Sequence, residues 1–356
     1  MQIYNTIGIM SGTSLDGLDI VYVKIYFDKV WKHDILSAKT YSYNKKWRIK
    51  LANAKELSAL ELINLNSDYG IFIGDKINAF INENNINKDK IDLIASHGHT
   101  IFHQPEKGFT YQIGCGAQIS TVTKIKTICD FRSLDVAHGG QGAPLVPIGD
   151  LHLFNEYEYC LNIGGIVNIS YNENGNRIAA DIDFANITSN TLAKKLGFQM
   201  DENGHIAQSG NINQPLLNEL GKNTFYKKKF PKSLAIEDYN RWYEPIINGH
   251  DISIEDKLHT AGFQMCQNIT NLINTKINHR VLVTGGGAYN SFWIKTMKKM
   301  GVNIVLPSQL IIEYKEALIF AFLGVLKIRN QVNTLSSVTG ASKDLVSGTI
   351  YDSKNF

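Results

Sequence analysis

The chain has 356 residues, which is too long for one compact core and suits two domains of ordinary size. Hydrophobic residues make up 44% and charged residues 19%, a composition typical of globular proteins that excludes disordered and fibrous classes. The net charge of +3 arises from 36 basic and 33 acidic residues scattered along the chain, which argues against a nucleic-acid-binding surface.

The N-terminal segment lacks the basic region, long apolar core and small-residue cleavage site of a signal peptide. No later apolar run approaches the length of a membrane span. We therefore expect a cytoplasmic protein whose partners include neither a membrane nor a nucleic acid.

The first predicted element is a hairpin whose strands are IGIM at 7–10 and LDIVYV at 18–23. Two turn residues would join such strands, yet SGTSLDG stands between them. Glycines allow backbone N–H groups to approach phosphate oxygens, and hydroxyls add further donors. A long exposed turn would use the same residue types, so this segment alone leaves both interpretations open. As a phosphate clamp it would use Ser11, Gly12, Thr13, Ser14 and Gly17, with Asp16 as a ligand of Mg²⁺ through water.

Strands and helices alternate through the next part of the chain. Apolar residues from Tyr69 to Ile81 recur at helical spacing, and strand DLIA at 92–95 runs into SHGHT. A strand at 127–129 ends in DFR, and the glycine-rich residues 138–147 predict an irregular connection. Polar residues thus follow each strand.

The second half repeats this pattern. Strands at 159–163 and 167–170 flank Gly164 and Gly165, and a strand near 178–182 precedes a helix that ends at Gly197. Later predicted elements are a strand at 281–283 that runs into TGGGA, a strand near 302–306 and an apolar helix from about 315 to 329. The alternation predicts an α/β architecture, in which ligands bind beyond strand ends.

Three tips of small residues, SGTSLDG, NIGGI and TGGGA, favour nucleotide binding. None of them matches the P-loop or the dinucleotide-binding motif. Seven segments carry a more specific resemblance, to the anhydro-N-acetylmuramic acid kinase family, over nearly the whole chain. In order they are MSGTSLDGLD, ASHGHTIFHQP, DFRSLDVAHGGQGAPLVP, LNIGGIVNIS, VTGGGAYN, KEALIFAFLG and SSVTGASKD.

The resemblance implies the fold of the actin-like, hexokinase and Hsp70 ATPase superfamily, with two RNase-H-like lobes and an interdomain cleft that closes on ATP. We expect a first lobe at 1–130 and a second lobe at 131–334. Whether the segment of about 335–356 belongs to the first lobe is left open. By analogy with the superfamily, the second phosphate loop contains Asn162, Gly164 and Gly165. The adenosine loop contains Gly285, Gly286, Gly287 and Ala288.

The activity that the resemblance implies belongs to bacterial cell-wall sugar recycling. Water opens the anhydro ring of 1,6-anhydro-N-acetylmuramic acid, and ATP with Mg²⁺ phosphorylates the released 6-oxygen. Glycoside hydrolysis ordinarily needs two carboxyl groups. One suffices if the γ-phosphoryl group captures the leaving oxygen while the carboxylate takes a proton from water.

Asp181 aligns with the base aspartate of the family, although a turn aspartate is the alternative interpretation. The family pattern is roughly F-D-T-G-P-x-N, whereas this chain reads ADIDFAN at 180–186, with Asp183 and Phe184 in place of small residues or proline. In an extended strand, Asp181 and Asp183 would share a face about 6–7 Å apart. That spacing would suit an inverting hydrolase, raise one pKa by like-charge repulsion or indicate weakened catalysis.

The predicted sugar-binding residues are His97 or Thr100, Arg132 and Glu316, each with a structural alternative. Arg132 would pair with the lactyl carboxylate or a phosphate, or form an ion pair with Asp130 or Asp135. Glu316 matches the family residue that faces the sugar hydroxyls, or it is a first-turn capping residue. A zinc site at His97, His99 and His103 lacks a nearby cysteine or carboxylate to complete its ligands.

Two other functions remain open at this stage. One is a catalytically impaired sugar- or nucleotide-binding relative, suggested by Ile182, Asp183 and Phe184. The other is an actin-like or chaperone-like ATPase without a sugar substrate, against which the SHGHT, DFR and KEA segments argue. A homodimer is also open.

Overall fold

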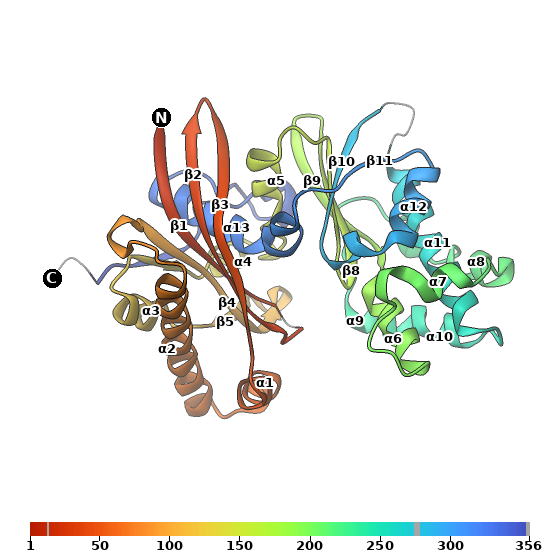
Figure 1. The fold of residues 1–356 in the computed structure, drawn as a ribbon, viewed down its shortest axis with the longest axis horizontal. Coiled ribbons are helices and arrows are strands. Elements are labelled where there is room, and N and C mark those ends of the chain that lie inside the picture. The colour runs from red at the N-terminus through yellow and green to blue at the C-terminus, as the bar shows by residue number, and fades with distance from the viewer. Residues whose placement is uncertain (13, 274–277, 354–356) are drawn as a thin grey trace. The chain divides into compact units, whose positions relative to one another are not determined.

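A computed structural model of the chain describes residues 1–12, 14–273 and 278–353. The chain forms two compact units, unit 1 with Met1–Leu153 and Tyr314–Phe356 and unit 2 with Phe154–Glu313 (Figure 1). Each unit contains its own sheet and its own hydrophobic core. Thr13, one of the predicted phosphate-binding residues, lies outside the described residues.

The sheet of unit 1 has the strand order β12-β6-β4-β1-β2-β3, with β5 paired to β4. β2 and β3 run antiparallel to their neighbours, whereas β4 and β6 run parallel to β1. The strands are β1 Gln2–Ser11, β2 Gly17–Asp28, β3 Val30–Ser42, β4 Leu93–Gln104, β5 Phe109–Ile113, β6 Thr127–Cys129 and β12 Thr349–Tyr351.

Helices cover this sheet, and the long helix α13 packs directly on its centre. A Cβ at Gly8 of β1 would collide with the backbone of Ala317 on α13, so this close approach requires glycine. The helices that lie in or enter unit 1 are α1 Lys45–Ala52, α2 Ala59–Glu83, α3 Gly116–Thr123, α4 Ser133–Ala137, α5 Pro147–Leu153, α13 Gln309–Ile328 and α14 Ser336–Thr339, with single turns at Ala54–Glu56, Lys88–Lys90 and Pro105–Lys107.

The sheet of unit 2 has the order β11-β10-β7-β8-β9. Its first three strands in the chain form an antiparallel meander, and the next two run parallel to the first. The strands are β7 Tyr159–Ile163, β8 Ile166–Glu173, β9 Asn176–Phe184, β10 Arg280–Thr284 and β11 Asn303–Val305.

One face of this sheet packs on α11, whose buried residues include Met265, Cys266 and Ile269. The helices of unit 2 are α6 Asn186–Lys195, α7 His205–Ser209, α8 Gln214–Leu220, α9 Ile236–Asp238, α10 Glu244–Asn248, α11 Ile254–Leu272 and α12 Ser291–Lys299, with short turns η4 Glu202–Gly204, η5 Thr224–Lys227, η6 Tyr239–Tyr243 and η7 Gly286–Tyr289.

The two sheets therefore repeat one topology. The order β3-β2-β1-β4-β6 in unit 1 corresponds to β9-β8-β7-β10-β11 in unit 2, with the same strand directions. This is the RNase-H-like arrangement, so the predicted α/β class with two such lobes is confirmed. The glycine-rich tips after β1 and after β7 occupy equivalent positions in the two sheets.

Three details differ from the sequence-based expectations. SHGHT lies within β4 and not at a loop tip, because β5 continues the pairing along the end of β4. α13 begins at Gln309, so Glu316 lies well inside the helix and the expected first-turn position is wrong. The expected domain boundary at residue 130 falls inside unit 1, and the domain division stays a prediction.

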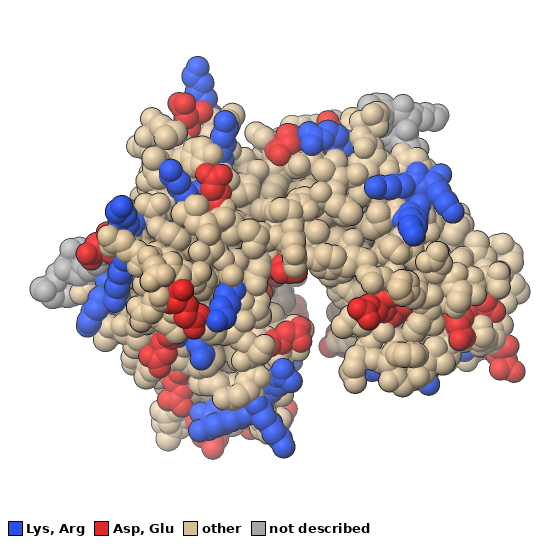
Figure 2. Space-filling view, in the orientation of Figure 1, with Lys and Arg blue, Asp and Glu red and all other residues tan. Residues whose placement is uncertain are grey.

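Basic and acidic side chains are interspersed over the visible face of unit 1 (Figure 2), as the nearly balanced charge leads us to expect. Among the described residues, no helix has the length and hydrophobicity that crossing a bilayer requires.

Candidate active site

The hairpin between β1 and β2 carries the first predicted phosphate loop. Ser11, at the end of β1, is buried, and its hydroxyl lies 2.7 Å from Tyr43 Oη and 2.8 Å from His99 Nδ1. Tyr43 Oη in turn lies 2.5 Å from Tyr69 Oη. The Ser11 hydroxyl thus has two protein partners, and it anchors the base of the loop to β4 and α2.

The exposed part of this loop contains Ser14 and Asp16, whereas Gly17 is buried and belongs to β2. A Cβ at Gly17 would lie 2.8 Å from the carbonyl oxygen of Tyr41, so close strand packing alone requires glycine there. No group of three His, Cys, Asp or Glu side chains suited to a metal ion occurs in the part of the chain that the structure describes.

Arg132, the residue directly before α4, is held by two contacts, one to β4 and one to the connection after α4. Its Nε donates to His97 Nε2 at 3.0 Å, and its Nη1 donates to the carbonyl of Gly142 at 2.6 Å. Burial, helped by the Arg132 charge, holds the pKa of His97 well below its usual range, so the ring is neutral. Because Nε2 accepts, the ring proton resides on Nδ1, which donates to the carbonyl of Gly98 at 2.9 Å.

Both ring nitrogens of His97 are therefore occupied, and this histidine orients Arg132. Burial lowers the pKa of Arg132 to about 10, which leaves the guanidinium charged at neutral pH. Thr100 differs from His97, because its hydroxyl accepts from Gln112 at 3.3 Å and keeps a proton to donate.

The glycine-rich connection after α4 is fixed by the buried carboxylate of Asp135. It accepts from the backbone N–H of Gly142 and from the hydroxyl of Thr339, both at 2.7 Å. Asp135 is fully buried. Because Gly142 also accepts from Arg132, this anchoring helps to determine where the guanidinium lies.

Glu316 lies on α13 beside a buried ion pair, with Lys315 Nζ 2.6 Å from Asp150 Oδ1 on α5. The Glu316 side chain is exposed. The protein around it displaces water and raises its pKa, while Arg132 and Lys315 act in the opposite direction. Unit 1 thus brings together Arg132, His97 and a carboxylate close enough to interact electrostatically.

In unit 2, the turn Gly164–Gly165 between β7 and β8 forms the second predicted phosphate loop. The carbonyl of Gly165 accepts from the backbone N–H groups of Ala185 at 2.9 Å and Ile187 at 3.3 Å, and that of Gly164 accepts from Asn186 at 3.1 Å. The start of α6 is therefore bonded directly to the turn.

The predicted adenosine loop follows β10 and lies against the same turn. Gly285 has a φ of +79°, and a Cβ there would lie 2.6 Å from Asn162 Oδ1 and 2.8 Å from the carbonyl of Ile163. A Cβ at Gly287 would collide with the Ile163 side chain. Unit 2 thus brings the TGGGA segment, the NIGGI segment and the end of β9 together.

Asp181 lies on β9, where it pairs with Asn168 of β8. Its Oδ2 accepts from the backbone N–H of Leu234 at 2.8 Å. Burial raises the pKa of Asp181 to about 6, and the Leu234 hydrogen bond acts against this rise. A carboxylate with such a pKa is ionised at neutral pH and is more basic than an ordinary aspartate.

Asp183 does not share a face with Asp181, contrary to the expectation from an extended strand. The β8–β9 register shifts between Val167 and Asn168, so that Val167 pairs with Asp183 and Asn168 pairs with Asp181. Consecutive residues of β8 point to opposite faces, and their partners therefore do so as well. This bulge at Ile182 excludes the inverting two-carboxylate arrangement for this pair.

The carboxylate of Asp183 is fully buried and has three hydrogen-bond donors. Oδ1 accepts from Phe184 N at 2.8 Å and Tyr226 Oη at 3.0 Å, and Oδ2 accepts from Asn268 Nδ2 at 2.7 Å. Burial raises its pKa to about 7, against the effect of these donors. The cause is desolvation and not the like-charge repulsion that the sequence suggested.

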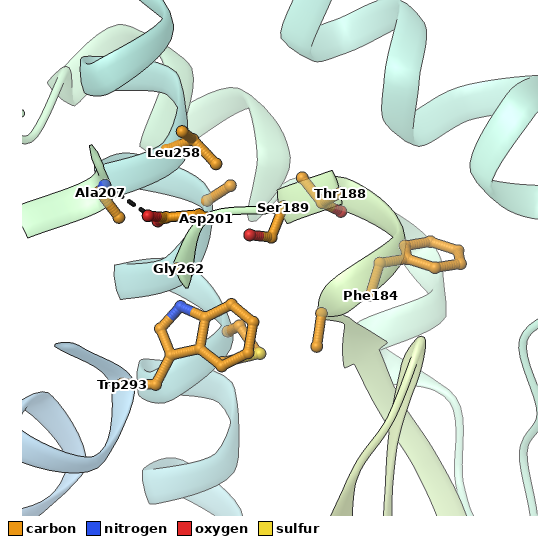
Figure 3. Close-up of a pocket in the computed structure, with 11 residues that line it drawn as sticks. Phe184, Thr188, Ser189, Asp201, Ala207, Leu258, Gly262 and Trp293 are labelled. Atoms are coloured by element: carbon orange, nitrogen blue, oxygen red, sulfur yellow. Dashed lines mark hydrogen bonds between the residues drawn. The ribbon is translucent and has the colours of Figure 1, made fainter. Parts of the chain in front are cut away.

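A small cavity in the core of unit 2 lies behind the start of α6, lined by residues that include Phe184, Thr188 and Trp293 (Figure 3). Asp201 borders it and accepts from Ala207 N at 3.0 Å. The cavity volume of about 10 Å³ is close to the minimum for a single water molecule, so it does not bind sugar or nucleotide.

Sequence reasoning missed the partners of both β9 carboxylates. Leu234, Tyr226 and Asn268 lie 53, 43 and 85 residues away along the chain, outside any local motif. The hydrogen bond by which His97 orients Arg132 was also not predicted. The SHGHT and DFR segments contain these two residues, but nothing in the sequence indicates that they form a hydrogen bond.

The two comparisons made by sequence agree with one another. The sequence profile described as "Anhydro-N-acetylmuramic acid kinase" matches residues 4–353. A protein of that name from Shewanella denitrificans is 35% identical over 368 residues, which cover 98% of this chain and 98% of its own. A namesake from Haemophilus influenzae is 32% identical, with 97% of each chain covered.

Among solved structures, the "Activator of the 2-Hydroxyisocaproyl-CoA Dehydratase from Clostridium difficile with bound ADPNP" matches with a TM-score of 0.43 and 13% identity. The match covers 92% of this chain and 97% of that chain. A likeness of this degree carries no argument about function.

The raised pKa of Asp183 generates a prediction about stability. The folded protein holds this proton with a pKa of about 7, against 3.8 in the unfolded chain, so Asp183 makes the folded state less stable as pH rises from about 4 to 7. Asp183→Asn removes this contribution. Relative to wild type, the variant should gain stability between pH 5 and pH 8, measured by urea unfolding. A difference that stays constant with pH would contradict the assignment.

Proposed function

The chain belongs to the anhydro-N-acetylmuramic acid kinase family, and we propose how its residues carry out the kinase reaction of this family. The protein is an ATP-dependent kinase of 1,6-anhydro-N-acetylmuramic acid, an enzyme of cell-wall sugar recycling. The product is N-acetylmuramic acid 6-phosphate. Full-length relatives with this name do not favour the alternative of an impaired binding protein.

The balanced reaction consumes one sugar, one water and one ATP. Water adds to the anomeric carbon as the bond from that carbon to the 6-oxygen breaks, and the 6-oxygen bonds to the γ-phosphorus as ADP leaves. We assign to Asp181 the removal of the proton from the attacking water. Two observations support this assignment. Asp181 lies near the end of β9, shortly before Ala185, whose backbone N–H bonds to Gly165, and burial raises its pKa.

We assign the phosphates to the two glycine-containing tips. Gly12 and Ser14 would contact them in unit 1, and Gly164 and Gly165 in unit 2, with Gly285 to Ala288 against the adenosine. Ser11 would act by anchoring its loop, since its hydroxyl already has two partners. Charge neutralisation on the phosphates would come from Mg²⁺. Asp16 is an exposed carboxylate of the kind that binds this ion together with water and phosphate oxygens.

We assign the sugar to Arg132, Glu316 and Thr100. The guanidinium keeps N–H groups beyond those used by His97 and Gly142, and its fork matches the lactyl carboxylate. Glu316 would accept from sugar hydroxyls, and Thr100 would donate. We assign no sugar contact to His97, because its ring nitrogens are occupied.

The first test is Asp181→Asn, which keeps the shape of the side chain and removes the base. We expect turnover to fall by about 10²–10⁴, the usual contribution of a general base, with ATP affinity unchanged. The measurements are sugar phosphate formed from ATP and the anhydro sugar, and ATP binding by calorimetry. Glu173→Gln, which changes an exposed carboxylate at the far end of β8, is the matched control. Wild-type turnover in Asp181→Asn would refute the assigned base.

The second test is the pH dependence of kcat/KM for the sugar. Asp181 must be ionised to accept a proton, so activity should rise with pH through about 6. Asp183 titrates near 7, and the same profile recorded in Asp183→Asn separates the two groups. The limb near pH 6 should persist in that variant. A limb near pH 4, or none, would show that Asp181 is not the titrating base.

The third test concerns Arg132. Arg132→Lys keeps the charge but loses the fork and the His97 contact, and it should raise the KM for the anhydro sugar about tenfold or more. The comparison substrate is 1,6-anhydro-N-acetylglucosamine, which lacks the lactyl carboxylate. The variant should lose less on this sugar. Equal losses on both sugars would show that Arg132 does not bind the carboxylate.

A further inference from the structure

Residues 224–234, the segment that begins with η5 and ends beyond Pro231, are tied to β9 at two places. At its start, Tyr226 Oη donates to Asp183 Oδ1 at 3.0 Å. At its end, the backbone N–H of Leu234 donates to Asp181 Oδ2 at 2.8 Å, and Asp181 N donates to the carbonyl of Lys232 at 3.0 Å. The segment therefore connects the two carboxylates of β9, which face opposite sides of the sheet.

The segment is also braced between these two ties. Lys232 Nζ donates to the carbonyl of Phe225 at 3.3 Å and lies 4.5 Å from the centre of the Phe225 ring. The same ammonium lies 5.5 Å from the centre of the Phe230 ring. Because Phe225 is the neighbour of Tyr226 and the carbonyl of Lys232 accepts from Asp181 N, contacts within the segment run continuously from one tie to the other.

The Asp183 side chain lies in the interior of unit 2 and not in the proposed substrate site. Its carboxylate is fully buried and bonds to β9, η5 and α11 through Phe184, Tyr226 and Asn268. Asp181 has fewer partners, because among the described residues only the Leu234 N–H donates to its carboxylate, at Oδ2. The Leu234 bond thus fixes the orientation of the carboxylate and leaves Oδ1 to accept a proton.

We propose that Asp183 is a positioning residue for the assigned base Asp181, acting through Tyr226 and residues 224–234 without touching the substrate. The inference rests on the proposed function in one respect, that Asp181 accepts the proton from water. Asp183, which departs from the family pattern, thereby has a role in the reaction. The chain places a carboxylate where the pattern has glycine and supplies Tyr226 and Asn268 to bind it.

The test uses Tyr226→Phe in the full chain, which removes only the hydroxyl at the first tie. We expect kcat to fall about tenfold or more, because Asp181 loses part of the support that fixes its orientation. KM for both substrates should change less than about twofold if the base alone is displaced. Amide hydrogen exchange at Leu234 should accelerate by a similar factor, because its N–H loses its fixed acceptor.

Two further variants separate positioning from general loosening of the core. Tyr243→Phe removes another fully buried hydroxyl from the same aromatic cluster. This hydroxyl donates to no carboxylate among the residues that the structure describes, so the variant should leave both kcat and Leu234 exchange unchanged. Asp183→Asn keeps an oxygen acceptor for Tyr226 and should retain kcat and Leu234 protection better than Asp183→Ala does.

The two readouts also separate this proposal from the proposed function. Wild-type protein that forms no sugar phosphate would refute the function, while Leu234 exchange would still report whether the tie exists. Unchanged Leu234 exchange in Tyr226→Phe would overturn the positioning role, whatever the rate. Faster exchange with an unchanged kcat would overturn it as well, as would equal effects in Tyr243→Phe.

Discussion

The arrangement of unit 2 depends on close backbone contact at the turn Gly164–Gly165. The start of α6 donates three backbone N–H groups to the carbonyls of this turn, and Gly285 lies where any Cβ would collide with Asn162 and Ile163. Only glycine permits backbones to approach this closely at a φ of +79°. The same contacts fix the end of β9, and with it Asp181, relative to the predicted phosphate and adenosine loops.

A one-residue bulge determines the different environments of the two β9 carboxylates. Because Ile182 has no partner in the β8 register, Asp181 and Asp183 face opposite sides of the sheet. Asp183 enters the core, where it has three donors, and Asp181 retains an oxygen for chemistry. The substitution of Asp183 for the glycine of the family pattern therefore adds a buried anchor and leaves the number of candidate bases at one.

Much of the fold could be predicted from the sequence, because strand and helix periodicity is local. The strands at 127–129 and 159–163 were predicted with the bounds that the structure gives. The start of α13 at Gln309 was missed, although Ser308, the residue directly before it, is of the type that caps helix N-termini. The shared order of the strands in the two sheets could not be predicted from strand patterns, because β3 was not predicted and the pairing of strands far apart in the chain leaves no local pattern.

Site residues that belong to a sequence motif could be predicted. Features that depend on strand register, or on contacts between residues far apart in the chain, could not. Glycine-rich tips and Asp181 stand out in the sequence, but the bulge at Ile182 depends on how β8 pairs with β9. The neutral state of His97 follows from burial and from Arg132, 35 residues away, which no local pattern records. These contacts are long-range, and a single sequence contains no signal for them.

In the proposed reaction, water attacks the sugar while the sugar's own 6-oxygen receives the phosphoryl group. The most direct measurement is the reaction in ¹⁸O-labelled water, with the products analysed by mass spectrometry and ³¹P NMR. We expect sugar 6-phosphate and ADP in equal amounts, with ¹⁸O on the sugar and none in the phosphoryl group. Labelled inorganic phosphate formed in place of sugar phosphate would contradict it, because water would then have attacked ATP.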